Sequence, residues 1–184
     1  MKKMAVIVAV LLLAFPIIAC SKPVEQSAAP QSSPQAQELV LDREIKGPYG
    51  ASLKVSSSWE EIQNANGSVQ YVTDKGTFVV QFYDNKDDVQ RISDLNRLYP
   101  ASFSNFKTVS SREKLIDGAR GIISVAEYFN NQRQENTIFT EIVFIHGNSA
   151  LRIAYIGVPD NYDPSLFDAV LETVKIDTSQ GKPQ

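Results

Sequence analysis

Alternating apolar and polar positions recur in short segments after residue 38 and predict an antiparallel sheet of about six to eight strands. Turn residues separate these segments, and Asp74-Lys75-Gly76 and Asp117-Gly118 are hairpin signals. Because bulky residues stand at consecutive positions in residues 77–84, both faces of the sheet are expected to be covered. The expected strands are residues 38–44, 51–55, 68–73, 77–84, 107–115, 119–129, 135–146 and 149–158.

The Gly147-Asn148 dipeptide is the clearest pairing signal in the chain. A two-residue hairpin loop at this point sets Ile142 opposite Ile153 on one face of the sheet. On the reverse face, Glu141 and Arg152 fall diagonally across the two strands, where their opposite charges are placed to pair. The sequence therefore predicts both the register of this hairpin and a cross-strand ion pair.

Two segments carry helical periodicity. The first helix is expected to start near Asp87 or Asp88, either of which can cap it, and to stop at Pro100. The second has Asp163 as its N-cap and Pro164 as its first residue, which is typical of a helix start. Its apolar stripe consists of Leu166, Phe167, Val170, Leu171 and Val174. Strands and helices do not alternate, so the pattern predicts an α+β fold in which helices cover an antiparallel sheet.

Residues 1–19 have the pattern of a secretory signal peptide. Two lysines precede an apolar run of fifteen residues that ends at Ile18, which is short for a membrane-spanning helix. The end of this run, Ile17-Ile18-Ala19-Cys20, resembles the lipobox of bacterial lipoproteins. The resemblance implies cleavage between Ala19 and Cys20 and acylation of the Cys20 sulfur with palmitate-like chains. The alternatives are a cleaved signal with an incidental cysteine and an uncleaved N-terminal anchor.

The lipoprotein resemblance also implies a location in the cell envelope. Ser21 follows the cysteine, and in proteobacterial lipoproteins a residue other than Asp there implies the outer membrane, facing the periplasm, rather than the inner membrane. Residues 20–37 then form a flexible tether, because their Ser, Pro, Ala and Gln bury too little apolar surface to order the chain. Such a tether reaches about 50 Å from the bilayer. A folded domain at 38–177 and a short tail at 178–184 follow it.

Composition excludes several classes of protein. A single cysteine forms no internal disulfide, and one cysteine with one histidine supplies no zinc site built on Cys or His pairs. The formal net charge is -3, and without Lys2 and Lys3 the remaining 16 basic and 21 acidic residues give -5. An acidic chain without clustered basic residues does not favour nucleic-acid binding. No cofactor is expected.

Three segments of the folded part share a pattern with a known group of domains. Residues 49–59 run from an aromatic-Gly pair through a strand to Trp59. A late strand, 150–158, runs into Pro159-Asp160, and a helical segment, 165–176, closes the domain. Together these resemble the PsbP-like domains, which include the extrinsic photosystem II subunit, a Ran-binding nuclear-import factor and bacterial lipoproteins of the DcrB type. The resemblance implies an α-β-α sandwich over residues 38–177, used for binding or assembly rather than covalent chemistry.

Two small groups of residues are candidates for a binding site. Asp84, Asp87 and Asp88 bring together oxygen ligands of the kind that hard cations prefer. The competing interpretation is a solvated loop that caps a helix, because the Gly and distal Glu of a calcium loop are missing. Tyr49 and Trp59 are candidates for the edge of a ligand groove, although an aromatic residue beside a strand is more often part of the core.

Catalytic chemistry has little support in the sequence. His146 lies beside a hairpin turn and is expected to face solvent, with no spacing that places an orienting carboxylate or a nucleophile near it. There is no Gly-x-Ser-x-Gly motif, and acylation would consume the only thiol, that of Cys20. We therefore expect a non-enzymatic lipoprotein that is anchored to the membrane through Cys20 and binds a protein partner or helps to assemble an envelope complex. The alternative is a periplasmic domain that binds a small ligand or a divalent cation.

Overall fold

The computed structural model describes residues 38–85, 87, 89–90, 99–177 and 179, apart from the side chain of Tyr49. All of them belong to one compact unit, Glu38–Gln184. Ala19, Cys20 and the expected tether lie outside the described residues, so acylation stays a prediction. No helix among the described residues is long and apolar enough to cross a membrane.

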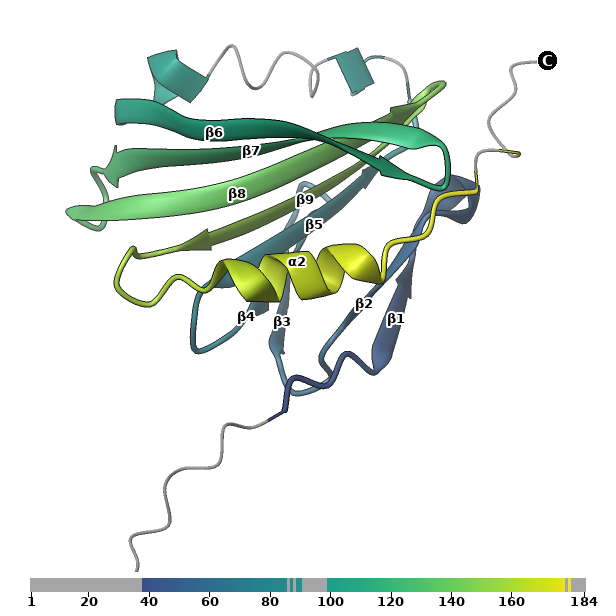
Figure 1. The fold of residues 1–184 in the computed structure, drawn as a ribbon, viewed down its shortest axis with the longest axis horizontal. Helices are drawn as coiled ribbons and strands as arrows, with labels where there is room; N and C mark the ends of the chain where they lie inside the picture. Colours follow the sequence, from purple (N-terminus) through teal and green to yellow (C-terminus); the bar gives the residue numbers. More distant parts are fainter. Residues whose placement is uncertain (1–37, 86, 88, 91–98, 178, 180–184) are drawn as a thin grey trace, which may run out of the picture. The chain divides into compact units, whose positions relative to one another are not determined.

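Seven antiparallel strands form the main sheet, in the order β3-β4-β5-β9-β8-β7-β6 (Figure 1). A separate two-stranded sheet pairs β1 with β2, and a short 3-10 turn, η1, connects these two strands. The fold class predicted from the sequence is confirmed. The strands are β1 (Arg43–Lys46), β2 (Ser52–Val55), β3 (Glu60–Gln63), β4 (Val69–Val72), β5 (Thr77–Tyr83), β6 (Ser104–Ile116), β7 (Ala119–Asn130), β8 (Glu135–His146) and β9 (Ser149–Gly157), with η1 at Pro48–Gly50 and α2 at Pro164–Glu172.

The register of the β8–β9 hairpin is as the two-residue turn predicts. Ile142 lies opposite Ile153, and both side chains are buried. Glu141 and Arg152 lie diagonally on the other face, two positions out of register, and form an ion pair. By contrast, β3 was not expected, because its four side chains are all exposed and give no alternation of apolar and polar positions.

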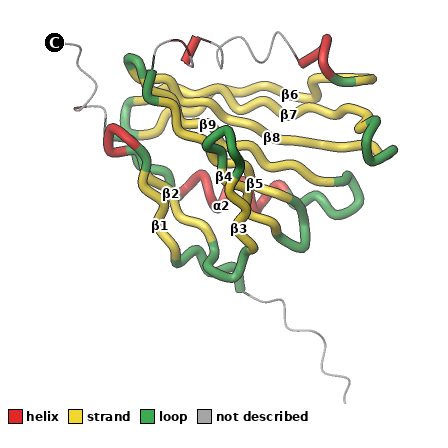
Figure 2. Tube along the Cα trace, turned by 180° about the vertical axis from the view of Figure 1, so that it is seen from behind, coloured by secondary structure: helices red, strands yellow, loops and turns green. Residues whose placement is uncertain are grey.

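Helix α2 covers one face of the sheet and forms the main core with it. The Asp163 side chain accepts a hydrogen bond from the Ser165 N–H at 3.0 Å, and Pro164 follows the cap, as predicted. Phe167, Val170 and Leu171 are buried against the sheet. Each such burial contributes about 1.5–3 kcal/mol. Figure 2, seen from behind, shows α2 on the far side of the strands.

The opposite face of the sheet carries smaller apolar clusters. Tyr99 packs there with Ala126 and Phe139. Most of the predicted first helix falls on residues 91–98, outside the described part of the chain. Its expected end is wrong, because residues 99–102 are helical and the Phe103 N–H still donates to the Tyr99 carbonyl at 3.0 Å. Proline removes only its own N–H, so the turn closes past it.

Pairing between β5 and β9 joins the first half of the domain to the second, with Val80 opposite Ile153. Neighbouring antiparallel strands run in opposite directions, so the end of one strand lies beside the start of the next strand in the sheet. The β4–β5 turn, the β7–β8 turn and the segment after β9 therefore meet at one end (left in Figure 1).

Candidate functional site

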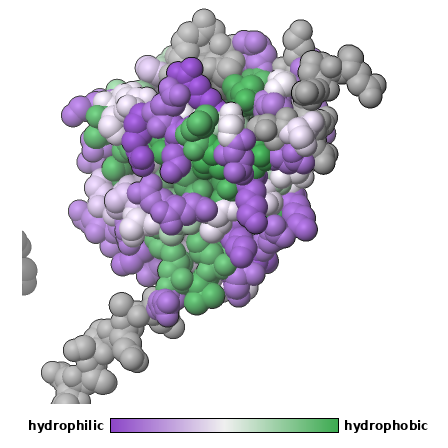
Figure 3. Space-filling model, turned by 45° about the vertical axis from the view of Figure 1, so that its right-hand side comes forward, coloured by the Kyte–Doolittle hydropathy of each residue, from purple (hydrophilic) through white to green (hydrophobic). Residues whose placement is uncertain are grey.

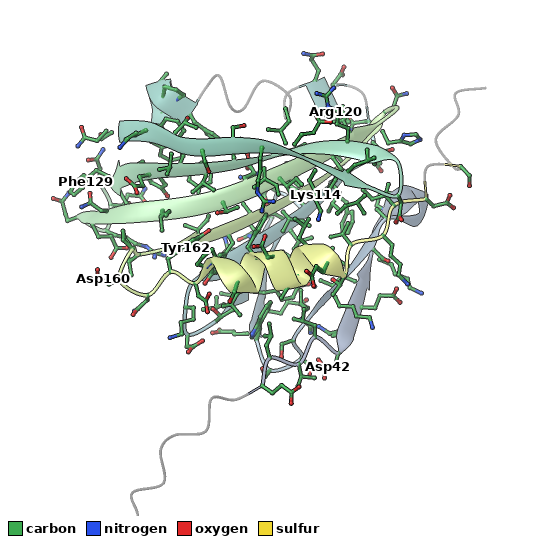
Figure 4. All side chains as sticks on the ribbon, viewed as in Figure 1. Asp42, Lys114, Arg120, Phe129, Asp160 and Tyr162 are labelled. Atoms are coloured by element: carbon green, nitrogen blue, oxygen red, sulfur yellow. The ribbon has the colours of Figure 1, made fainter. Side chains whose placement is uncertain are left out.

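A cleft of about 410 Å³ opens at the end of the sheet where these three connections meet. It lies toward the face opposite α2, and its volume is within the roughly 300–1,000 Å³ typical of small-molecule sites. Figure 4 labels Phe129 and Asp160 at this end, each next to a residue that lines the cleft. Polar side chains dominate the lining, among them Lys75, Tyr128, Gln132, Arg133, Thr137 and Asn161.

One wall is the β4–β5 turn, which packs tightly against the end of β9. A Cβ atom on Gly76 would lie 2.4 Å from the Ile156 carbonyl oxygen, and one on Gly157 would lie 2.9 Å from the Lys75 carbonyl oxygen. Only glycine fits such a backbone approach. Thr73 Oγ1 accepts hydrogen bonds from the Lys75 and Gly76 N–H groups, each at 3.0 Å. This wall is therefore fixed by backbone packing as well as by the turn itself.

The opposite wall is the β7–β8 turn. Asn130 Oδ1 accepts hydrogen bonds from the Gln132 N–H at 3.0 Å and the Arg133 N–H at 3.2 Å. The Gln134 N–H donates to the Asn130 carbonyl at 2.8 Å, which closes the loop. An Asn that bonds the backbone two residues on is a common way to hold a turn. The turn thereby presents Gln132 and Arg133 at the cleft.

Tyr128 and Thr137 lie opposite one another on β7 and β8 and form the inner part of the cleft. The Tyr128 ring packs on Phe103, with 4.3 Å between ring centroids. Burial raises the pKa of Tyr128, while a hydrogen-bond interaction with the Thr137 hydroxyl opposes that rise. Thr137 is only 4% exposed, and its Oγ1 is buried next to Tyr128.

A buried polar network lies further along the same face. Arg152 Nε donates to Glu141 Oε2 at 2.5 Å, and the Tyr99 hydroxyl donates to the same oxygen at 2.8 Å. Arg152 Nη2 also donates to the Tyr99 hydroxyl at 3.2 Å. Burial and then the charge of Glu141 raise the pKa of Tyr99. Burial disfavours the charged guanidinium, but Glu141 and Tyr99 outweigh this effect and raise the pKa of Arg152.

No protein-family model and no curated protein sequence matches the chain. Among solved structures, cyanobacterial PsbP (CyanoP) from Synechocystis sp. PCC 6803 is similar at a TM-score of 0.51 and 11% identity, covering 80% of this chain and 99% of that one. The chain has a PsbP-like fold. At this identity the likeness shows the fold alone.

Two further structures are similar to the PsbP-like domain. A protein from Bacteroides thetaiotaomicron matches at a TM-score of 0.51 and 14% identity, over 74% of this chain. This chain spans only about half of that protein's length, 49%. LpqN, involved in cell envelope biogenesis of Mycobacterium tuberculosis, matches at a TM-score of 0.48 and 12% identity, over 72% of this chain and 90% of its own.

Among the site residues predicted from the sequence, those that the structure describes, Asp84, Asp87 and Trp59, do not line the cleft. Asp84 and Asp87 are exposed, and Asp88 lies outside the described residues. Within the described ranges, no three His, Cys, Asp or Glu side chains are grouped to hold a metal ion. The Tyr49 side chain is also outside the described part. The Trp59 ring stacks on Phe78, with centroids 5.0 Å apart, and packs against the main core.

The expectation that His146 faces solvent is wrong. The residue is half-buried beside Phe144 and Leu151, and its Nε2 is buried without a hydrogen bond to another described residue. The cavity at this point holds about 30 Å³, which is on the scale of one water molecule rather than a substrate. The β8–β9 turn is so tight that its first flanking residue stays packed on the core.

The turns that form the cleft can be predicted from the sequence, but the cleft itself cannot. The sequence shows two separate polar turns, Asp74-Lys75-Gly76 and residues 130–134, and gives no sign that they lie together. Their meeting depends on the pairing of β5 with β9, which no local pattern indicates. Thr137 was hidden for a related reason, because one threonine in a strand gives no sign that its hydroxyl is buried.

Proposed function

We propose that this protein is a lipid-anchored component of the cell envelope whose PsbP-like domain binds a polar small ligand in the cleft, without covalent chemistry. The observation that carries this proposal is the cleft of about 410 Å³ and its largely polar lining, which includes Tyr128, Gln132 and Thr137.

Ligand binding is tested by thermal unfolding of the full chain against a panel of polar metabolites. A ligand that binds only the folded state raises the melting temperature with its concentration. Gln132→Ala and Thr137→Val should remove that shift, whereas Gln63→Ala, an exposed glutamine on β3, should keep it. Calcium and manganese belong in the same panel, with Asp84→Asn as the variant that tests the cation alternative. A shift that survives both cleft variants contradicts the proposed site.

The anchor is supported by the Ile17-Ile18-Ala19-Cys20 motif and the polar tether behind it. Each methylene group of an acyl chain that is buried in the bilayer contributes about 0.8 kcal/mol. One acyl chain alone binds the membrane only marginally, whereas two chains anchor a protein stably. Cys20→Ala should therefore move the protein from the membrane to the soluble fraction, while Ser21→Ala should leave it anchored. Density-gradient separation of inner and outer membranes then tests the proposed outer-membrane location. A Cys20→Ala protein that stays membrane-bound at wild-type levels contradicts lipid anchoring.

A second candidate function is assembly with a protein partner. Leu115, Ile122 and Ile145 stand on the sheet face opposite α2 and are 65%, 49% and 41% exposed. Figure 3 shows apolar surface set among polar regions on one side of the domain. A photo-crosslinking amino acid placed at Ile122 or at Gln132 separates the two functions in cells. A protein crosslinked through position 122 but not through position 132 would favour assembly with a partner at Leu115, Ile122 and Ile145.

A further inference from the structure

The chemistry of the cleft narrows the class of its ligand; this step rests on the proposed function. Four charged side chains line the cleft, and their formal charges sum to zero. Lys75 and Arg133 are positive, and Asp74 and Glu135 are negative. Arg133 Nη1 lies 3.8 Å from Glu135 Oε1, and Lys75 is near enough to Asp163 to lower the pKa of that carboxyl. A charged ligand would meet as many repulsive as attractive partners here. The balance favours a ligand without net charge.

Side-chain amides supply most of the remaining polar groups. The amides of Gln70, Gln132 and Asn161 line the cleft and are hydrogen bonded to no residue in the described ranges. Asn130 uses its amide oxygen to hold the β7–β8 turn, which leaves its NH₂ as a donor. An amide offers both donors and an acceptor, and so does a hydroxyl group. Several side-chain amides in one cleft can therefore form hydrogen bonds with a ligand that carries many hydroxyl groups.

Tyr128 and Thr137 complete this match at the inner end. Tyr128 is half-buried and lines the cleft, where its phenolic hydroxyl can donate a hydrogen bond or accept one. Thr137 lies beside Tyr128 on the neighbouring strand and also lines the cleft. Only three of the residues that line the cleft are large and apolar, Val79, Ile156 and Val158, so an acyl chain would find little to contact.

An extended peptide is also neutral and polar, but the topology disfavours it. Peptides gain affinity by adding a strand to a free sheet edge. The strands that end at this cleft, β4, β5, β9, β8 and β7, each pair with a neighbouring strand on both sides. Their edges are therefore occupied, and the cleft offers turn backbone and side chains instead. We propose that the cleft binds a neutral, polyhydroxylated ligand of the carbohydrate class, such as a short glycan.

Calorimetric titration of the full chain tests this, in a polyoxyethylene detergent because sugar-based detergents would compete. The neutral probes are triacetylchitotriose and maltotriose. The comparison probes are chitotriose, which has the same backbone with positive charges, trigalacturonic acid, which is anionic, and trialanine amide. The variants are Gln132→Ala and Thr137→Val in the cleft, with Gln63→Ala and Thr108→Val as matched controls on exposed positions of β3 and β6. Circular dichroism verifies that each variant is folded.

We expect a neutral trisaccharide to bind and its charged counterparts to bind more weakly. Each cleft variant should lower the affinity about tenfold. The matched controls should leave the affinity unchanged. Binding of a charged trimer or of the peptide, sensitive to the cleft variants, with no binding of neutral sugars overturns the carbohydrate class and leaves the proposed function standing. No binding of any probe, or binding that the cleft variants do not weaken, overturns both.

Discussion

Arg152 Nε lies 2.5 Å from Glu141 Oε2 in an ion pair whose side chains are only 18% and 2% exposed. The two residues stand on adjacent strands, and the Tyr99 hydroxyl bonds the same carboxylate oxygen from a segment that precedes β6. The pair therefore ties the residues before β6 to the centre of the sheet. Because the partners are buried, their interaction is little screened by solvent.

Arg152→Met should destabilise the fold by about 3–5 kcal/mol, because it leaves the Glu141 carboxylate buried without its counterion. Glu141→Leu combined with Arg152→Met should recover most of that loss, since no charge is then left unpaired. The free energy of unfolding, measured by urea denaturation of the full chain, tests both expectations.

The matched control is Arg120→Met, which breaks an ion pair with Glu113 across β6 and β7 at 2.6 Å. Both partners of that pair are largely exposed, so the loss should be at most about 1 kcal/mol. Equal losses for Arg120→Met and Arg152→Met would show that burial does not set the strength of the Arg152 pair.

The Glu141–Arg152 pair also shows how far the sequence specifies this fold. The Gly147-Asn148 turn fixes the register of β8 and β9 locally, so the diagonal pair could be predicted. The third partner, Tyr99, is 42 positions from Glu141, and its contact depends on how the segment before β6 crosses the sheet. Local patterns specify hairpins, whereas contacts between distant segments require the assembled sheet.

The cleft, too, depends on contacts between segments that are distant in the sequence. Gln132 and Lys75 come from turns that were both visible as turns, and they line one cleft only because β5 pairs with β9. The predicted ligands Asp84 and Asp87 show the reverse case, since carboxylates close in sequence lie on exposed positions. Carboxylates that are close in sequence do not necessarily point toward a common site.

Asp163→Ala should lower the stability of the domain by about 1 kcal/mol at neutral pH, through loss of the α2 cap. Hydrogen bonds from the Ser165 hydroxyl and then its backbone N–H lower the pKa of Asp163 below its ordinary value of 3.8. A carboxylate with a lowered folded pKa stabilises above its unfolded pKa and loses that effect as pH falls. The difference between Asp163→Ala and wild type should thus shrink on acidification.

Urea unfolding at pH 7 and at pH 3 measures this difference. Asp160→Ala is the control, because Asp160 is exposed in the same loop and caps no helix. An Asp163→Ala deficit that stays constant between the two pH values would count against the cap as its origin.

Tyr155→Phe should weaken the alkaline destabilisation of the domain. Burial raises the pKa of Tyr155 and Tyr162 to about 12, against an ordinary value of 10.0. Because the folded pKa is raised, the contribution to stability is complete below about pH 10 and is lost as pH rises toward 12. Phenylalanine keeps the stacking on Phe78, at 4.5 Å between centroids, and removes the ionisable hydroxyl.

Urea midpoints at pH 9 and pH 11 provide the test, with absorbance at 295 nm to follow tyrosine ionisation. The wild-type midpoint should fall more steeply between these values than that of the variant. Identical slopes, or complete tyrosine ionisation near pH 10 in protein that is still folded, would show that burial of Tyr155 does not hold its hydroxyl protonated.

Gly76→Ala should both destabilise the domain and deform the cleft, because the new Cβ would lie 2.4 Å from the Ile156 carbonyl oxygen. A backbone atom cannot move aside as a flexible side chain can, so the β4–β5 turn must shift away from β9. Overpacking of this kind typically costs about 1–3 kcal/mol. Gly67→Ala in the β3–β4 turn is the matched control, since nothing lies within 4 Å of its Cβ position.

Gly67 has a φ of 79°, so alanine there carries only the cost of a left-handed backbone, about 1–2 kcal/mol. Amide resonances separate the two effects better than stability does. In Gly76→Ala the amides of Thr77, Gly157 and Asn161 should shift, because the turn and the end of β9 share one wall of the cleft. In Gly67→Ala these three amides should stay in place. Unmoved cleft amides in Gly76→Ala would mean that the turn does not depend on its contact with β9, and the cleft would then lack the fixed wall that ligand binding requires.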